Sequence, residues 1–313
     1  MEFVTLSLLN GAIYGMLLFM VSAGLTLIFG MMGVLNFAHA SFYMLGAYFA
    51  YTLSGMFNFW VGLIVAPLMV GVFGVIIERT MLRRVHRHGH AHELLLTFGI
   101  ALICEELVKL FYGDFPVNYQ MPAELNFSAF TVFGTNYPFY RLFIGLVAVA
   151  MFAALLIVLT KTRIGIIVRG AERLPKMAEA LGHNVPLVFM GVFGAGAALA
   201  GLGGAVAGAF YPTNPNMALD LGVIVFVVVV VGGLGSLEGS LVASLLIGIF
   251  TSFAVGLDWS IAGLMGLVGL GGVAEAIGGP LTLTLSSASG TVPFLMMLIV
   301  LLVRPAGLMG SRN

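Results

Sequence analysis

Most of this chain is divided into apolar segments that are long enough, or nearly long enough, to cross a lipid bilayer. A membrane-spanning helix needs about 20 apolar residues. Of the 313 residues, 60% are hydrophobic and 8% are charged. This hydrophobic fraction is larger than the core of a soluble protein requires. We therefore expect an all-α, polytopic transmembrane helix bundle that forms a single domain over residues 1–313. The apolar windows are 8–30, 41–55, 60–77, 93–112, 138–160, 185–210, 221–232 with 238–256, 260–278 and 292–303.

The chain contains 42 glycines, too many to be filler at positions that face lipid. Small residues let transmembrane helices approach each other closely. Glycine-rich backbone is also typical of interrupted helices that line a solute path. We expect broken or re-entrant helices within the bundle.

Basic residues occur in three clusters, and this predicts the orientation of the chain. Cytoplasmic loops of membrane proteins carry an excess of Lys and Arg, whereas the intervening segments here carry Glu2, Asp114, Glu124, Asp220 and Asp258. The clusters are therefore expected inside and the C-terminus cytoplasmic. The N-terminus lies outside if the first three windows are full spans. The clusters comprise Arg79, Arg83, Arg84 and Arg87; Lys161, Arg163, Arg169, Arg173 and Lys176; and Arg304 and Arg312.

Residues 161–184 form the longest charged stretch, and we interpret them as a coupling segment. Leu174, Met177, Ala178 and Leu181 recur at helical spacing, which predicts an amphipathic helix over Arg173–Leu181 that ends at Gly182. Such a helix between two spans suits the docking of a soluble partner. The predicted coupling residues are Arg173, Leu174, Lys176, Met177, Ala178, Glu179, Leu181 and Gly182.

Two segments of the pattern Gly-x-Leu-x5-Ser indicate a pseudo-repeat of two halves. Residues 33–41 align with residues 232–240 without gaps, and each segment precedes an apolar helix. Transporters built from duplicated halves place the solute path at the repeat interface, beside interrupted helices. We expect both helix starts at the inner ends of spans, as parts of an exit gate, although their polar residues could equally act as helix caps. The predicted path residues are Asn36, His39, Ser41, Ser236, Glu238 and Ser240.

Glu105 and Lys109 are four residues apart within one apolar window, with Glu106 beside them. Pairing lowers the free energy of placing charges in a membrane, so an ion pair near the outer end of a span is the first interpretation. The alternative is an ion-coupled secondary carrier or channel in which Glu105, Glu106 and Asp114 bind ions. A secondary carrier or channel has no ATPase to dock, so it would not need the apolar residues that recur at helical spacing in the coupling segment.

The sequence contains none of the motifs that would make the chain an enzyme. In a Walker A loop, lysine follows glycine, but Lys109, Lys161 and Lys176 follow Val, Thr and Pro. The single Cys104 excludes a disulfide framework. We expect no cofactor, with ATP bound and hydrolysed by partner subunits.

Four histidines alternate at positions 86, 88, 90 and 92, and an extended loop could use them to bind a transition metal. Two arginines lie in and beside the same stretch, at positions 84 and 87. This mixture favours a solvated polar face, and we expect no metal site.

Five motifs give the chain a resemblance to LivH-like permease subunits of branched-chain amino-acid ABC importers. They occur in the order typical of that family and cover nearly the whole chain. The motifs are residues 24–48, residues 96–102, residues 169–172 with 177–185, residues 231–240 and residues 303–310.

The resemblance implies a multi-pass protein of the bacterial inner membrane. Its implied partners are a LivM-like second permease, two cytoplasmic ABC ATPases, a periplasmic solute-binding protein and the lipid bilayer, without nucleic acid. It also implies that the helix at Arg173–Leu181 contacts the ATPase. The implied substrate is a branched-chain amino acid, with urea, short amides and aromatic carboxylates as alternatives.

The chain departs from the family pattern after Asp258. Residues 259–290 add a glycine-rich apolar stretch where the family usually proceeds to its last span. The addition is either an extra helix with a re-entrant segment or a lid on the outer face.

Overall fold

The structure is a computed structural model that describes residues 1–132, 134–257, 259–260, 263, 279 and 283–310. Most of the apolar window 260–278 and of the added stretch 259–290 lies outside these residues, as do Asp258 and Arg312. Helices dominate the described part, whose single sheet is a two-stranded antiparallel hairpin. This agrees with the predicted helix bundle.

Each apolar window in the described part coincides with a helix. The first half of the chain contains α1 (Glu2–Met32), α2 (His39–Met56), α3 (Phe59–Ile77), the π-helical turn η1 (Glu78–Leu82), α4 (Arg83–Val85), η2 (His86–His88) and α5 (His90–Tyr112). The middle contains η3 (Ala123–Leu125), β1 (Ser128–Val132), β2 (Thr135–Pro138), α6 (Phe139–Lys161), α7 (Arg163–Arg173) and α8 (Pro175–Ala180). The last part contains α9 (Val185–Ala207), α10 (Met217–Gly232), α11 (Leu237–Gly256), η5 (Ser289–Thr291) and α14 (Val292–Val303).

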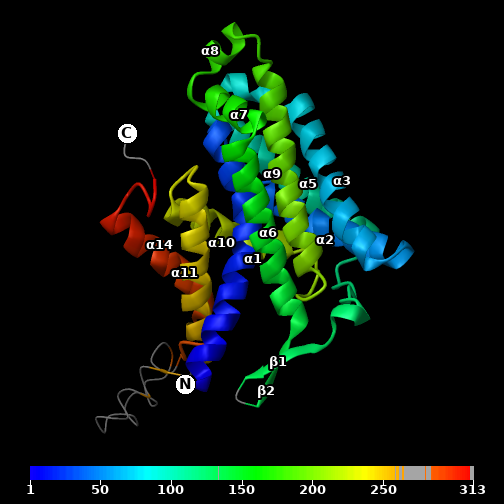
Figure 1. The fold of residues 1–313 in the computed structure, drawn as a ribbon, viewed down its shortest axis with the longest axis vertical. Coiled ribbons are helices and arrows are strands. Elements are labelled where there is room, and N and C mark those ends of the chain that lie inside the picture. Colours follow the sequence, from blue (N-terminus) through cyan, green and yellow to red (C-terminus); the bar gives the residue numbers. More distant parts are fainter. Residues whose placement is uncertain (133, 258, 261–262, 264–278, 280–282, 311–313) are drawn as a thin grey trace.

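Five helical segments of the described chain are long and apolar enough to cross a membrane. They are α1, α3 with its continuation to Val85, α6, α9 and α11. Among them α1 is the central helix, since 67% of its apolar window is buried inside the protein, against 17% for α6 at the periphery. Figure 1 shows α1 running through the middle of the bundle.

Small residues bring the central helices into close contact, as the glycine content predicts. A methyl group added at Gly24 of α1 would lie 2.3 Å from the main-chain oxygen of Gly196 in α9. The pair Thr26–Ser240 joins α1 to α11 through a hydrogen bond of 2.7 Å between their hydroxyl oxygens. Thr26 donates its own proton to the main-chain oxygen of Ser22, so Ser240 is the donor in the pair.

The two ends of the bundle differ in charge. The basic residues of the first two clusters lie at the end formed by η1, α4, α7 and α8, while the β1–β2 hairpin and the N-terminus lie at the other end (Figure 1). The last described residues return to the basic end, because Leu308 N–H donates to the main-chain oxygen of Val231 at the end of α10. This separation supports the predicted orientation.

Candidate functional site

The chain between α1 and α2 folds back into the bundle. Gly33, at φ +65°, ends α1 in the left-handed conformation that favours glycine. The six residues that follow lead to His39, whose Nε2 lies 2.8 Å from the main-chain oxygen of Val21. Val21 precedes the end of α1 by eleven residues, or roughly 16 Å at 1.5 Å per residue. The first repeat segment therefore starts its helix deep within the bundle, which corrects the expectation that it lies at the inner end of a span.

The physical reason for this depth is that protein covers the irregular backbone. Unpaired main-chain groups are tolerated at membrane depth only where protein or water surrounds them. Asn36, His39 and Ser41 are all buried. The stretch is thus a broken helix of the kind that the sequence predicts.

Two polar atoms at this helix start are buried and lack hydrogen-bond partners among the described residues. Asn36 Oδ1 accepts a hydrogen bond from Ala38 N–H at 3.1 Å in the turn before α2, but its Nδ2 has no partner. His39 donates through Nε2 to a carbonyl oxygen, which leaves Nδ1 as a buried acceptor without a donor. An unpaired donor and an unpaired acceptor in one place can satisfy a polar solute or a water molecule.

Both side chains line a cavity with a volume of ≈ 140 Å³. Its walls come from the start of α2, the middle of α5 and the first half of α10, and they are mostly apolar. Phe37 stacks on Phe226 with ring centroids 6.3 Å apart and joins the broken segment to α10. Ser41 lines the same wall, so the structure brings the three path residues of the first half together.

Glu105 also lines this cavity, and it is paired as the sequence predicts. Lys109 Nζ lies 2.7 Å from Glu105 Oε1 and 3.0 Å from Glu106 Oε1. The ammonium group therefore contacts both neighbouring carboxylates of α5. This arrangement matches the ion-pair interpretation.

The three path residues of the second half do not line this cavity. Ser236 caps α11 by accepting from Gly239 N–H at 3.1 Å, and Glu238 is exposed. Ser240 is occupied by its bond to Thr26. A methyl group added at Gly30 would lie 3.3 Å from Gly235, so the start of α11 is near the basic end of α1. In the gapless alignment of the two segments, the starts of α2 and α11 differ by one position. In the structure, however, the two helix starts lie at different depths in the bundle.

The coupling segment differs from the expected single helix. α7 ends at Arg173 and α8 spans only Pro175–Ala180, with Leu174 between them at φ −139° and ψ 68°. A residue before proline is disfavoured in the helical region because the proline ring clashes with it. The predicted helix over Arg173–Leu181 is therefore wrong in its extent. Its predicted end holds, since Gly182 follows at φ +87°.

The apolar side chains of the coupling segment are unpartnered within this chain. Leu174, Met177 and Leu181 are 59%, 62% and 79% exposed, whereas Ala178 is buried against the bundle. The polar members Lys176 and Glu179 are exposed as well. Exposed apolar residues beside charged ones form the surface that a docking partner needs.

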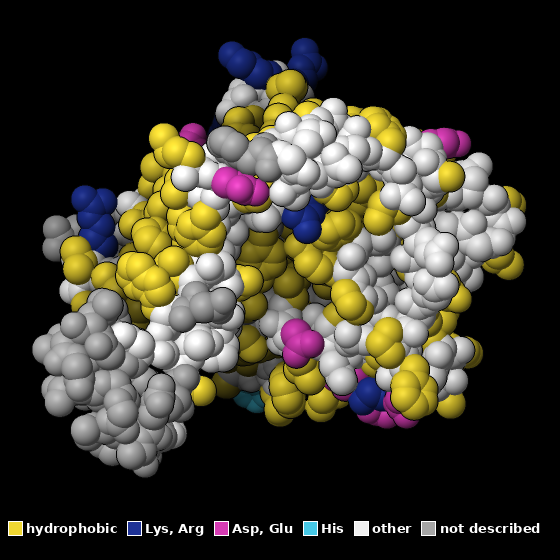
Figure 2. Space-filling view, turned by 90° about the horizontal axis from the view of Figure 1, so that it is seen from below, with side chains coloured by type: hydrophobic (Ala, Val, Ile, Leu, Met, Phe, Trp, Pro, Cys, Tyr) yellow, Lys and Arg dark blue, Asp and Glu magenta, His cyan; other side chains and the backbone are white. Residues whose placement is uncertain are grey.

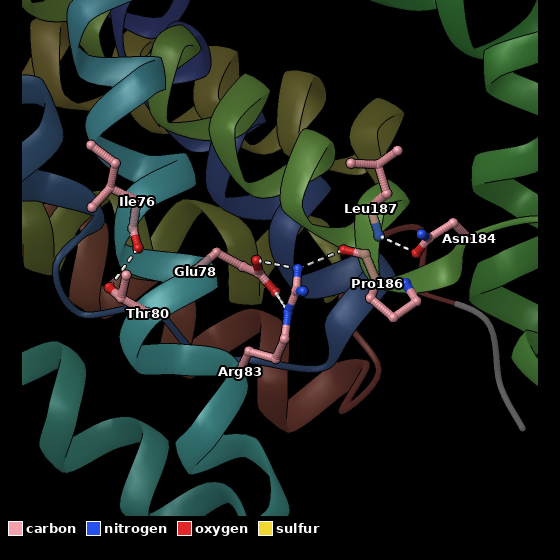
Figure 3. Close-up of polar contacts among 7 residues, drawn as sticks. All are labelled: Ile76, Glu78, Thr80, Arg83, Asn184, Pro186 and Leu187. Carbon is pink, nitrogen blue, oxygen red and sulfur yellow. Dashed lines mark hydrogen bonds and ion pairs between the residues drawn. The ribbon is translucent and has the colours of Figure 1, made fainter.

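An ion pair that the sequence analysis missed holds this region to α3. Arg83 donates to both carboxylate oxygens of Glu78, at 3.1 and 2.8 Å, and also to the main-chain oxygen of Pro186 at 2.8 Å (Figure 3). Asn184 caps the same first turn of α9 by accepting from Leu187 N–H. The first turn of α9, which directly follows the coupling segment, is thus anchored to the end of α3. The spacing of Glu78 and Arg83 was visible in the sequence, but their contact with Pro186 was not.

Two of the four alternating histidines contact a buried carboxylate. Glu93 is 1% exposed and contacts the Nδ1 atoms of His86 and His90, the latter at 3.2 Å. His88 and His92 instead lie against each other. In the described part of the chain, no group of three or more potential ligands could hold a metal ion.

Comparisons with known proteins agree on one family. A family model described as "Branched-chain amino acid transport system / permease component" matches residues 7–301. The permease protein LivH of the high-affinity branched-chain amino acid transport system from Salmonella typhimurium is 27% identical, over 96% of this chain and 94% of the relative. The corresponding BraD protein from Pseudomonas aeruginosa is 26% identical, over 97% and 94%.

Proposed function

The chain belongs to the family of permease components of branched-chain amino-acid transport systems, and on this premise we propose that it moves branched-chain amino acids into the bacterial cytoplasm. The proposal includes related small polar solutes such as urea, short amides and aromatic carboxylates as alternative cargo. The solute passes the broken helix at Asn36 and His39. There the donor Asn36 Nδ2 and the acceptor His39 Nδ1 are buried and have no hydrogen-bond partner in the described structure.

The observation that carries an ATP-driven mechanism is the exposed apolar surface of the coupling segment. Leu174, Met177 and Leu181 project from the basic end of the bundle. Partner ATPases that bind there would supply the energy, because the chain has no nucleotide-binding loop of its own. The Arg83 contacts with Glu78 and Pro186 would carry their movement into α3 and α9.

The remaining partners follow from the same proposal. A LivM-like permease would complete the membrane core, two ABC ATPases would bind at the cytoplasmic end, and a periplasmic binding protein would deliver solute at the opposite end. The clustering of basic residues supports an inner-membrane orientation with the last described residues in the cytoplasm.

The ion-coupled carrier finds less support. Glu105 and Glu106 both share the Lys109 ammonium group, so neither is a free carboxylate for a coupling ion.

Uptake by an assembled importer tests the proposed function. The chain would be reconstituted in proteoliposomes with its second permease, its ATPases and its binding protein, and loaded with ATP inside. We expect uptake of labelled leucine, isoleucine and valine that stops without ATP or without this chain. Uptake that persists without ATP but follows an imposed ion gradient would contradict it. Uptake of urea or benzoate in preference to leucine would reassign the cargo.

A further inference from the structure

A second cavity lies at the end of the bundle opposite the coupling segment, and no role proposed above uses it. We call it the outer cavity. It has a volume of ≈ 530 Å³ and lies between the start of α1, the start of α6, the loop after α9 and the end of α11. Figure 2 views the molecule from this end and shows that the face is hollowed near its centre. The polar residues that line the cavity are Ser7, Asn10, Tyr14, Arg141, Tyr211, Thr251 and Ser252, beside apolar neighbours.

Arg141 is the single charged residue among the described residues that line the outer cavity. Its Nη1 donates to Asn10 Oδ1, and its guanidinium lies 5.2 Å from the ring centroid of Phe210 and 5.6 Å from that of Tyr137. Rings attract a cation but do not neutralise it. No carboxylate of the described chain forms an ion pair with Arg141, in contrast to Arg83 and Lys109.

Two residues that line the cavity each hold a buried polar atom that has no hydrogen-bond partner in the described structure. One is Arg141 Nε, and the other is Thr251 Oγ1, which comes from α11 on another side of the cavity. Buried polar atoms nearly always have partners, and an unpaired one calls for an explanation. Guanidinium and hydroxyl donors that surround one space suit a carboxylate, which accepts hydrogen bonds at both of its oxygens.

Tyr211 adds a third donor to the same space. Burial raises the pKa of its hydroxyl, and the nearby Arg141 cation lowers that pKa by less. The hydroxyl therefore stays protonated at neutral pH and can donate a hydrogen bond. Asn10 is already used, because its Oδ1 accepts from both Arg141 and the Tyr137 hydroxyl.

We propose that the outer cavity binds the carboxylate group of a small solute, with Arg141 as the counter-ion and Thr251 and Tyr211 as further donors. Its connection to transport rests on the proposed function, because an imported amino acid would meet this cavity on leaving the binding protein. The site would favour amino acids and aromatic carboxylates over urea and amides, which carry no negative charge. The site would therefore restrict the substrates to solutes that carry a carboxylate group.

Isovalerate and isovaleramide are matched probes for this proposal, since they share a branched carbon skeleton and differ in the charge of one group. Saturation-transfer difference NMR would be recorded on the assembled permease complex in phosphatidylcholine nanodiscs, without ATP. We expect a signal for isovalerate and none for isovaleramide. Equal signals for the two probes, or no signal for isovalerate, would overturn the proposal.

Three variants locate the binding. Arg141→Gln removes the cation and should weaken isovalerate binding about tenfold or more, whereas Arg84→Gln, a matched change at the exposed basic end, should not. Thr251→Val deletes a hydroxyl that makes no hydrogen bond in the described structure, so the protein should still fold while binding weakens. Unchanged isovalerate binding in Arg141→Gln, or in Thr251→Val if the arginine variant does not fold, would refute the site.

The same preparations separate this proposal from the proposed function. If leucine uptake depends on the chain but isovalerate binding does not depend on Arg141, the carboxylate site fails alone. If isovalerate binding depends on Arg141 while the complex imports no amino acid, the transport proposal fails and the site stands.

Discussion

Arg83 and Glu78 form an ion pair at 2.8 Å in which the carboxylate is 2% exposed and the guanidinium also reaches the main chain of α9. Replacing Arg83 with Gln would leave a buried carboxylate without its cation. A buried charged group that loses its partner retains its full desolvation penalty. We expect a loss of roughly 1–3 kcal/mol in stability, measured as a lower midpoint of thermal unfolding in detergent.

The neighbouring Arg84 provides the control for this prediction. Its side chain is exposed and forms no ion pair within the described structure, so Arg84→Gln should leave the midpoint unchanged. The double variant Glu78→Gln with Arg83→Gln should recover part of the loss, because it removes the orphaned charge. Equal midpoints for Arg83→Gln and Arg84→Gln would show that the pair contributes nothing.

The exposed apolar side chains of the coupling segment predict that charged substitutions there will impair docking of the ATPases. Leu174→Asp together with Met177→Asp places two charges where an apolar partner surface would bind, while neither side chain supports the fold of this chain. ATPase subunits should co-purify poorly with the variant, and solute uptake should fall at least about tenfold, the effect of losing some 1.4 kcal/mol of coupling. The permease itself should remain in the membrane.

Phe115→Asp is the matched control for the docking variant. Phe115 is 84% exposed but lies in the loop after α5, at the opposite end of the bundle. It should not affect ATPase binding. Parental uptake and full ATPase recovery in the coupling-segment variant would refute docking at this surface.

The different depths of the two repeat segments give different expectations for their residues. His39 is buried, lines the cavity between α2, α5 and α10, and has an acceptor atom without a partner in the described structure, so His39→Ala should lower the maximal rate of uptake severalfold. Glu238 is exposed at the first turn of α11 and outside that cavity, so Glu238→Gln should change the rate less than about twofold. Initial rates over a range of solute concentrations would measure both. A larger effect at Glu238 than at His39 would reverse this assignment.

Hydropathy alone predicts the helices of this fold because the bilayer requires long apolar segments, and every described window lies in a helix. The break at Leu174 was also readable, since Pro175 follows it directly. The apolar periodicity favours a continuous helix across this position, whereas the proline ring disfavours the helical conformation at Leu174. The structure follows the proline, so the local chemistry of this dipeptide is sufficient to predict the break.

The parts that the sequence could not predict depend on contacts between distant residues. The hydroxyl pair Thr26–Ser240 spans 214 positions, and the contact of Arg141 with Asn10 spans 131. A single sequence, taken alone, carries no signal for such pairs. The depth of His39 has the same origin, because it is set by the carbonyl of Val21 and the close approach of α9 to Gly24.

Gly24 is predicted to be essential for the packing around His39. A methyl group there would lie 2.3 Å from Gly196 O and 2.9 Å from His39 Cε1, so Gly24→Ala must push α1 and α9 apart. We expect a lower unfolding midpoint together with reduced uptake. Gly145→Ala on α6 is the control, since nothing lies within 4 Å of the added methyl group and alanine stabilises helices by about 0.5–1 kcal/mol relative to glycine. Similar midpoints for the two variants would argue against the close contact.

The last prediction concerns the orientation of the bundle in the membrane. Arg84 and Arg169 lie at the basic end, whereas Asp114 and Glu124 lie near the opposite end, and all four are exposed. In a background in which the buried Cys104 is replaced by alanine, single cysteines at these positions would be treated with a membrane-impermeant thiol reagent in cells whose outer membrane admits it. Because basic loops stay in the cytoplasm, cysteines at 114 and 124 should react in intact cells, and those at 84 and 169 only after the inner membrane is opened. Reaction of the cysteines at 84 and 169 in intact cells would invert the orientation, and it would place the coupling segment on the wrong side for a cytoplasmic ATPase.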